Sequence, residues 1–139
     1  MTGAIFHPDD PEVVLFSHKE LACRSTGVVR MAPGFAEHLV ELRVEFDNKM
    51  IVTSGGRSKL HNDTMTPRGH PRSLHVYDFN ARGLKGFAAV DVKTETEALQ
   101  IELAQRALAK GWSVGVYRTW LHIDRRDLAG LAQQLFPGR

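Results

Sequence analysis

The chain of 139 residues has a single cysteine, Cys23, and no long hydrophobic run. One cysteine excludes a disulfide within the chain, so stability must come from packing, to which a bound metal can add. The uninterrupted apolar stretches are short, such as Val13–Phe16, whereas a membrane-spanning helix needs about 20 apolar residues. The first residues, Met1–Asp10, lack the basic start and apolar stretch of a secretory signal. We therefore expect no membrane span and a cytoplasmic start for the chain.

Charge of one sign is also scarce, because 18 Lys and Arg against 16 Asp and Glu leave a formal net charge of +2. So small an excess does not predict nucleic-acid binding, which depends on many cationic contacts with phosphates. A composition of 42% hydrophobic and 24% charged residues is ordinary for a soluble globular protein. The length fits one domain, and neither a repeat nor a linker divides the chain. We expect a single domain over residues 1–139, and a monomer.

Capping motifs and hydrophobic spacing predict helices in the first half of the chain. Ser17 and Glu20 form an S-x-x-E capping box, which favours a short helix ending near the Cys23–Gly27 turn. After Gly34, four apolar residues recur at the spacing that places them on one side of a helix. They are Phe35, Leu39, Leu42 and Phe46. This stripe is the predicted core face.

The remaining segments alternate between strand, loop and helix patterns. Thr94 and Glu97 form a second capping box, which predicts a helix through Lys110 that Gly111 stops. The other predicted elements are a strand at Met50–Thr53, a long loop at Ser54–Ser73, strands at Gly86–Val92, Trp112–Tyr117 and Trp120–Asp124, and a helix at Arg126–Leu135. This order predicts an α+β fold in which helices pack against a small antiparallel sheet.

Histidine and carboxylate residues fall at the ends of the predicted strands. Asp91 ends an apolar strand, where an ionised carboxylate is costly unless it meets a cation. His122 and Asp124 stand two positions apart in a strand, so their side chains point to the same face. His75, Asp91 and His122 together make a set of two imidazoles and one carboxylate, which suits zinc with a water in the fourth position. Structural histidines, and an acid at the start of the Thr94 helix, are the alternative interpretation.

Four short segments carry a recognisable pattern. They are S-G-G-R-S-K-L-H-N at 54–62, S-L-H at 73–75, G-F-A-A-V-D at 86–91 and L-H-I-D at 121–124. Taken in order, they resemble the M15 family of zinc peptidases, which comprises D-alanyl-D-alanine carboxypeptidases and peptidoglycan endopeptidases, including phage endolysins. The likeness runs from about Phe16 to Asp124 and implies the DD-peptidase or hedgehog-like zinc peptidase fold.

The resemblance implies a role for each matching side chain. It implies that His75, Asp91 and His122 bind Zn²⁺. Arg57 would contact the substrate or stabilise the oxyanion formed when water attacks a peptide carbonyl, because its fixed fork of donors holds a negative oxygen without losing charge. Ser73 would help to hold the substrate.

The chain departs from the family pattern in the spacing of the first two ligands. His75 and Asp91 are sixteen positions apart, whereas seven is usual in the family, so the connection carries about nine extra residues. Asp78 is the rival ligand within that connection. Asp91 is preferred because Gly86 and Ala89 keep the small-residue context that lets a strand approach a metal.

A second departure concerns the general base. Relatives place a carboxylate three residues before the last histidine ligand, and Thr119 stands there in this chain. Asp124 is the nearest acidic substitute, either as the base or by fixing the orientation of a ligand histidine. His61 and His70, in the long loop, could also handle protons or substrate, although solvated loop histidines are the simpler interpretation.

The predicted function is a zinc metallopeptidase, a carboxypeptidase or endopeptidase that hydrolyses amide bonds in peptidoglycan stem peptides or cross-links. Arg57 and Asp124 are the predicted catalytic residues, and Arg57 and Ser73 the predicted substrate contacts. Without a secretory signal, such an enzyme would act as a phage or prophage endolysin that accumulates in the cytoplasm and reaches the wall after release. The alternative is a non-catalytic, zinc-stabilised domain that binds the cell wall or belongs to a virion.

Overall fold

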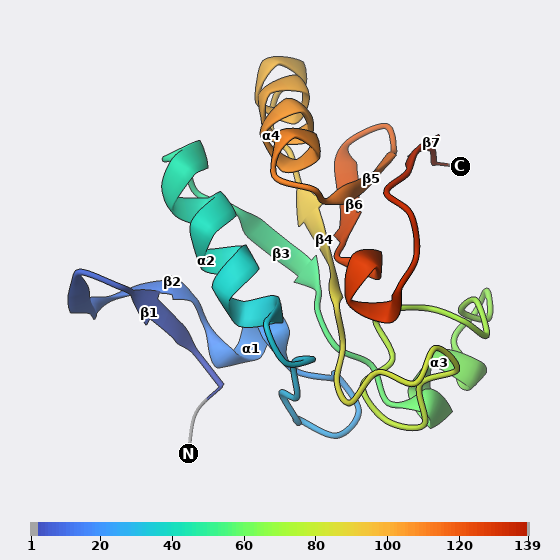
Figure 1. Ribbon diagram of the computed structural model, residues 1–139. Coiled ribbons are helices and arrows are strands. Elements are labelled where there is room, and N and C mark those ends of the chain that lie inside the picture. The colour runs from blue at the N-terminus through green and yellow to red at the C-terminus, as the bar shows by residue number, and fades with distance from the viewer. Residues whose placement is uncertain (1–2, 139) are drawn as a thin grey trace.

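The structure is a computed structural model that describes residues 3–138, and its elements are labelled in Figure 1. The strands are β1 (Ile5–His7), β2 (Asp10–Phe16), β3 (Ile51–Ser54), β4 (Ala89–Lys93), β5 (Ser113–Val116), β6 (Trp120–Asp124) and β7 (Leu135–Pro137). The helices are α1 (His18–Leu21), α2 (Phe35–Phe46), α3 (Lys59–Thr64), α4 (Glu97–Ala109) and the short 3₁₀ helix η1 (Arg126–Ala129).

The larger sheet has five strands in the order β3-β4-β6-β5-β7. Four of them pair in antiparallel fashion, while β7 lies parallel to β5 at one edge. The α+β prediction is therefore confirmed, with a parallel edge strand that the sequence did not suggest. In the β4–β6 register, Asp91 lies opposite His122. Directly paired residues project from the same face of a sheet, so this register brings the two side chains together.

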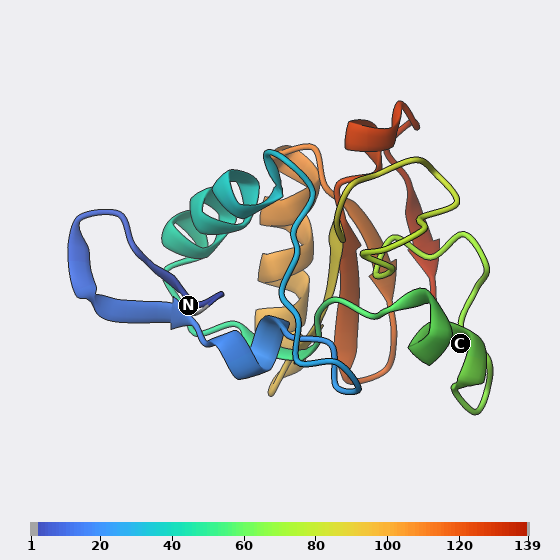
Figure 2. The same cartoon turned by 90° about the horizontal axis from the view of Figure 1, so that it is seen from below.

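Helices α2 and α4 cover one face of the sheet, and the long connection between β3 and β4 lies on the other side (Figure 2). The predicted stripe on α2 is fully or almost fully buried, as expected. The ring of Phe35 contacts Phe87 and Trp112 edge-on, with centroids 5.6 Å apart in both pairs. These three aromatic side chains form the centre of the core between helix and sheet.

A two-stranded antiparallel hairpin, β1–β2, extends away from the larger sheet (Figures 1 and 2). The predicted capping box follows it and is confirmed. Ser17 Oγ accepts a hydrogen bond from Glu20 N, and Glu20 Oε1 accepts one from Ser17 N. The other oxygen of Glu20 accepts from Val52 N at 3.1 Å, which ties α1 to β3. None of the helices described in residues 3–138 has the length and hydropathy to cross a membrane.

Two predicted element boundaries were wrong in detail. The cap of α4 is Thr96, whose side chain accepts from Leu99 N, and not Thr94, whose hydroxyl donates to the Thr119 carbonyl. The predicted strand at Gly86–Val92 begins only at Ala89. Before it, backbone bonds with the Arg30–Ala32 segment hold the chain outside the sheet.

The predicted helix at Arg126–Leu135 was also wrong. The chain makes only the one turn of η1, which ends at Gly130 with φ +76°, and then runs extended into β7. Tertiary contacts override the helical pattern, because Gln134 N donates to Ser113 Oγ and Gln134 O accepts from Val114 N. The long loop at Ser54–Ser73 similarly contains a helix, α3, capped by Ser58.

Candidate metal centre

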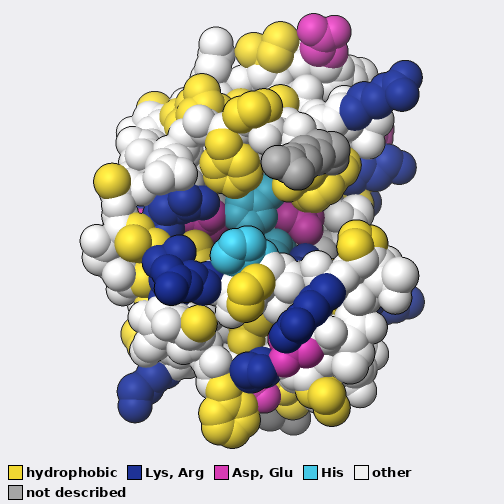
Figure 3. Space-filling model, turned by 90° about the vertical axis from the view of Figure 1, so that its right-hand side faces the viewer, with side chains coloured by type: hydrophobic (Ala, Val, Ile, Leu, Met, Phe, Trp, Pro, Cys, Tyr) yellow, Lys and Arg dark blue, Asp and Glu magenta, His cyan; other side chains and the backbone are white. Residues whose placement is uncertain are grey.

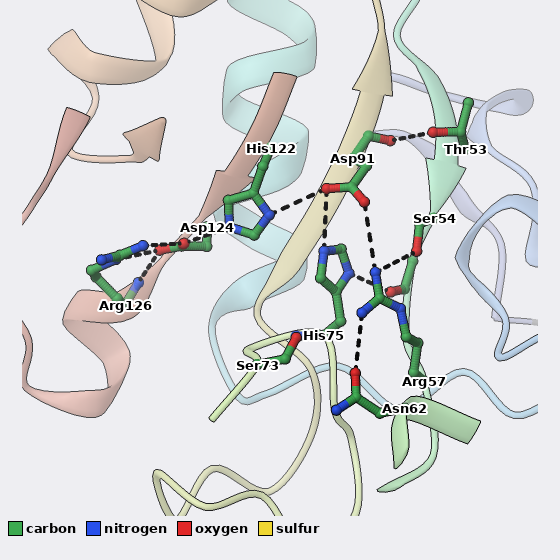
Figure 4. A network of polar contacts seen from close by, with 11 residues as sticks. Thr53, Ser54, Arg57, Asn62, Ser73, His75, Asp91, His122, Asp124 and Arg126 are labelled. Atoms are coloured by element: carbon green, nitrogen blue, oxygen red, sulfur yellow. Dashed lines mark hydrogen bonds and ion pairs between the residues drawn. The ribbon is translucent and has the colours of Figure 1, made fainter. Parts of the chain in front are cut away.

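The three predicted ligands converge although they are far apart in the sequence (Figure 4). Asp91 and His122 come from the paired strands β4 and β6. His75 lies in the β3–β4 connection, where the backbone is fixed on two sides. Arg57 N donates to the His75 carbonyl at 2.8 Å, and Ala88 N donates to the Leu74 carbonyl at 2.8 Å. The long connection thus holds His75 against the start of β4.

One oxygen of Asp91 lies between the two imidazoles. Asp91 Oδ1 is 3.2 Å from His75 Nε2 and 3.2 Å from His122 Nδ1. One ligand atom from each of the three residues lies within 4.8 Å of the other two. His75 and Asp91 are buried, and His122 is half-buried. This separation allows the three atoms to reach one small cation with little movement.

The other nitrogen of each imidazole has an acceptor. His75 Nδ1 lies 2.8 Å from the Gly55 carbonyl, and His122 Nε2 lies 2.7 Å from Asp124 Oδ2. A nitrogen that donates to such a partner leaves the other ring nitrogen with its lone pair when the ring is neutral. The inward nitrogens and Asp91 Oδ1 then form three acceptors that face one another, and they repel one another unless a metal cation or a proton lies between them. These residues therefore fit a divalent metal.

The charges in the cluster agree with this view. Burial opposes the charged form of His122, but hydrogen bonds with Asp124 and Asp91 outweigh it and raise the His122 pKa to about 9. Burial keeps the pKa of His75 below its ordinary value, with only partial compensation from Asp91. Burial works against ionisation of Asp91 too, yet the two histidines lower the pKa of this carboxyl. In the metal-free protein the His122 ring is therefore charged near pH 7, and its inward nitrogen carries a proton where a metal would bind.

Asp124 lies behind His122 rather than beside the cluster. Its side chain is fully buried, and all its hydrogen bonds come from two neighbours. Oδ1 accepts from N and Nε of Arg126 at 3.0 Å, while Oδ2 accepts from Nη2 of Arg126 at 2.8 Å and from His122 Nε2. Of the two predicted roles for Asp124, this geometry favours the orientation of His122.

Arg57 reaches the cluster from the opposite side. Its Nη2 lies 3.7 Å from Asp91 Oδ2 and donates to Ser54 Oγ at 3.3 Å, while Nη1 donates to Asn62 Oδ1 at 3.2 Å (Figure 4). The side chain is largely buried, so these partners fix the direction of the guanidinium. Arg57 therefore presents donors beside the predicted metal position.

Two cavities meet at the cluster. The first, of about 430 Å³, is lined by all three predicted ligands and by Ser73. The second, of about 470 Å³, shares Arg57, Asp91 and Trp120 with the first. On the surface, histidine side chains lie at the centre of this face, with acidic side chains on both sides and basic ones nearby (Figure 3). An extended ligand can therefore cross the predicted metal position from one cavity to the other.

The remaining candidates are not among the three converging residues. Asp78 accepts a hydrogen bond from Lys59 N at 2.6 Å, at the start of α3, and is not part of the cluster. Thr119 is exposed at the β5–β6 turn and lines a third cavity with Asp91 and Trp120, but not the first. His70 lines the first cavity and His61 the second.

Sequence reasoning missed three groups that support the cluster. The Gly55 carbonyl orients His75, and glycine is required there because a Cβ would lie 2.5 Å from the Leu21 carbonyl oxygen. Asn62 holds Arg57, and its place as the last residue of the S-G-x-R-S-x-x-H-N motif was the available signal. Arg126 was predicted only as the first residue of the last helix, and its proximity to Asp124 in the sequence was the one indication of its bonds to that carboxylate.

Comparison with known protein families matches residues 14–124 of the chain to Peptidase M15. The chain belongs to the M15 peptidase family. Searches among curated proteins and solved structures gave no match. The family match begins within β2 and ends at Asp124, so it includes the three predicted metal ligands and Arg57. As an M15 peptidase, the chain is a hydrolase of a family that generally depends on zinc, and its His-Asp-His cluster offers a place for the metal.

Proposed function

We propose that this M15 peptidase is a zinc enzyme that hydrolyses an amide bond in peptidoglycan stem peptides or their cross-links. The observation that carries the proposal is the convergence of His75 Nε2, Asp91 Oδ1 and His122 Nδ1. The Gly55 carbonyl and Asp124 contact the outer nitrogens of the two rings, and the pairing of β4 with β6 places Asp91 opposite His122. The likeness of the four motifs to wall-cleaving M15 enzymes supports the substrate class.

The three inward atoms would hold Zn²⁺, which, when bound, acts as a Lewis acid that makes its water more acidic and polarises the substrate carbonyl. The chain's own groups have separate tasks. Gly55 and Asp124 fix the rings of His75 and His122, so that both present a lone pair. Arg57 is placed to donate to a negatively charged oxygen of the substrate. Ser73 lines the cavity in which the substrate would lie.

The experiment combines metal analysis with hydrolysis. Purified protein is analysed for zinc, and product release from purified peptidoglycan is followed before chelation, after chelation and after zinc is restored. We expect about one zinc per chain, and activity that is lost and regained with it. The His122→Ala variant should lose both the metal and the activity. Activity that persists without metal, or a protein that takes up no zinc, would contradict the proposal.

A second function has one specific observation in its favour. Thr119 replaces the usual acid, and the four hydrogen bonds to Asp124 occupy the nearest alternative carboxylate. A chain that binds zinc and wall fragments without a general base would be a non-catalytic binding domain. Zinc-loaded protein that co-sediments with peptidoglycan but releases no product over long incubation would favour this alternative over the enzyme.

A further inference from the structure

The first cavity is rich in cations for a chain with so small a net charge. Four arginines line it: Arg57, Arg72, Arg82 and Arg126. Asp91 is the one carboxylate among the described residues that line this cavity, and it belongs to the metal cluster. The second cavity is more evenly charged, with Lys19, Arg24 and Arg57 against Glu20 and Asp91. The two cavities, on either side of the metal cluster, therefore differ in charge.

Two of the four arginines are already paired. Arg57 lies beside Asp91, and Arg126 makes its bonds to Asp124. Arg72 and Arg82 differ, because neither side chain has a hydrogen-bond or ion-pair partner among residues 3–138. Arg82 is half-buried, and its Nε is fully buried without an acceptor. A buried donor left without a partner costs free energy, so an acceptor from outside the chain would stabilise it.

The backbone on both sides of His75 directs these two cations to the cavity. Asn80 Nδ2 donates to the Val76 carbonyl at 2.8 Å, and Asn80 Oδ1 accepts from Arg82 N at 2.8 Å. A similar local bond joins Arg72 N to His70 Nδ1 at 3.0 Å. Arg82 thus comes from the fifteen residues between His75 and Asp91, the segment in which this chain is longer than its family pattern.

We propose that Arg72 and Arg82 form a carboxylate-binding subsite in the first cavity, which selects peptides with a negative charge on that side of the cleaved amide. The guanidinium fork fits a carboxylate with two parallel hydrogen bonds, and partial burial strengthens these hydrogen bonds. The inference rests on the proposed function, because it assigns the direction in which a substrate lies across the metal cluster. The even charge of the second cavity leaves the neutral part of the peptide for that end.

Two sources in a stem peptide carry this chemistry, the C-terminal carboxylate and the free α-carboxylate of its γ-linked glutamate. Three synthetic forms of L-Ala-γ-D-Glu-L-Lys-D-Ala-D-Ala separate them: the free acid, the C-terminal amide, and the form whose glutamate α-carboxylate is amidated. Binding of each is measured by NMR titration of the full chain in a chelator, where no cleavage interferes. Hydrolysis of the same peptides is measured separately with zinc-loaded protein.

We expect one of the two amidations to weaken binding about tenfold. The carboxylate whose amidation has this effect is the one that binds to the arginines. The variants Arg82→Gln and Arg72→Gln should weaken binding of the free acid similarly, while binding of that amidated form stays unchanged. Lys85→Gln is the matched control, since Lys85 is exposed in the same connection, lies outside the cavity and carries the same charge. Arg72 is exposed, so its variant tests the subsite even if the Arg82 variant folds poorly.

Equal affinity for all three peptides would overturn the subsite, as would equal effects of Arg82→Gln and Lys85→Gln, or no binding at all. The failure of the proposed function looks different. In that case zinc-loaded protein cleaves none of the peptides, while the titrations still report whether a carboxylate and the two arginines determine binding.

Discussion

Oδ2 of Asp124 lies 2.7 Å from Nε2 of His122, on the side of the ring that faces away from Asp91. Arg126 occupies the rest of that carboxylate with three hydrogen bonds. The arrangement is a chain of contacts from a guanidinium through a carboxylate and an imidazole to the predicted metal position. Such an arrangement restrains the ring of His122 and, when the ring is neutral, favours the tautomer with its proton on Nε2.

The variant Asp124→Asn should bind zinc about 10- to 100-fold more weakly, because the amide does not fix the His122 ring as the ionised carboxylate does. Competition with a chromogenic chelator measures this affinity. Asp9→Asn removes the same charge from an exposed position in the β1–β2 turn and should leave the affinity unchanged. Unchanged zinc affinity in the Asp124 variant would show that the carboxylate does not support the ligand.

Zinc should stabilise the fold, and Asp91 should be needed for this while Asp78 should not. A free zinc concentration a thousandfold above Kd would add about 4 kcal/mol to the free energy of unfolding. Asp91→Asn should abolish the zinc-dependent rise in Tm, and Asp78→Asn should retain it, since Asp78 bonds to the Lys59 amide outside the cluster. The reverse result would make Asp78 the ligand, with a rearranged connection. Thermal unfolding with added zinc and with a chelator measures both.

Local patterns were sufficient for the parts of the fold in which neighbours in sequence decide the structure. The spacing of Phe35, Leu39 and Phe46 predicted the buried face of α2, and the Ser17–Glu20 box predicted the start of α1. The last segment was predicted wrongly because its structure depends on Ser113 and Val114, which lie about 20 residues earlier and pair with Gln134. Contacts so distant in sequence leave no periodic pattern.

The site shows the same division. The alternation of side chains in a strand placed His122 and Asp124 on one face, and the motifs identified the three converging residues. The sequence could not show that Asp124 is saturated by Arg126, or that the Gly55 carbonyl orients His75. Hydrogen bonds to a backbone carbonyl depend on the path of the chain, which the residue type at one position does not reveal.

The core interpretation of Phe35 has a direct stability test. Its side chain is fully buried between Phe87 and Trp112, so Phe35→Ala should lower the free energy of unfolding by about 3–5 kcal/mol. Phe79 is 84% exposed, and Phe79→Ala, which removes the same atoms, should change it by less than about 0.5 kcal/mol. Urea unfolding of the metal-free protein measures both. Similar losses in the two variants would contradict the assigned core.

Zinc binding near pH 7 should release about one proton per ion, and the pKa of His122 fixes the range in which this occurs. In the metal-free protein this pKa is raised from 6.5 to about 9, so the ring is charged below about pH 9 and zinc must displace its proton. Zinc affinity should therefore rise about tenfold for each pH unit up to that value and then level off.

The same pKa shift makes the metal-free fold less stable as the pH rises, whereas it makes zinc affinity increase. A folded pKa above the unfolded one contributes stability that is complete below about pH 6.5 and is lost as the pH rises through about 9. Calorimetric titration in two buffers of different ionisation enthalpy counts the protons released. Asp124→Asn, which removes the hydrogen-bonded charge partner that contributes most to this rise, should release fewer protons near pH 7 than the unaltered chain. Zinc binding without proton release in the unaltered chain would mean that His122 is neutral before the metal arrives and donates a hydrogen bond to only one of the two carboxylates.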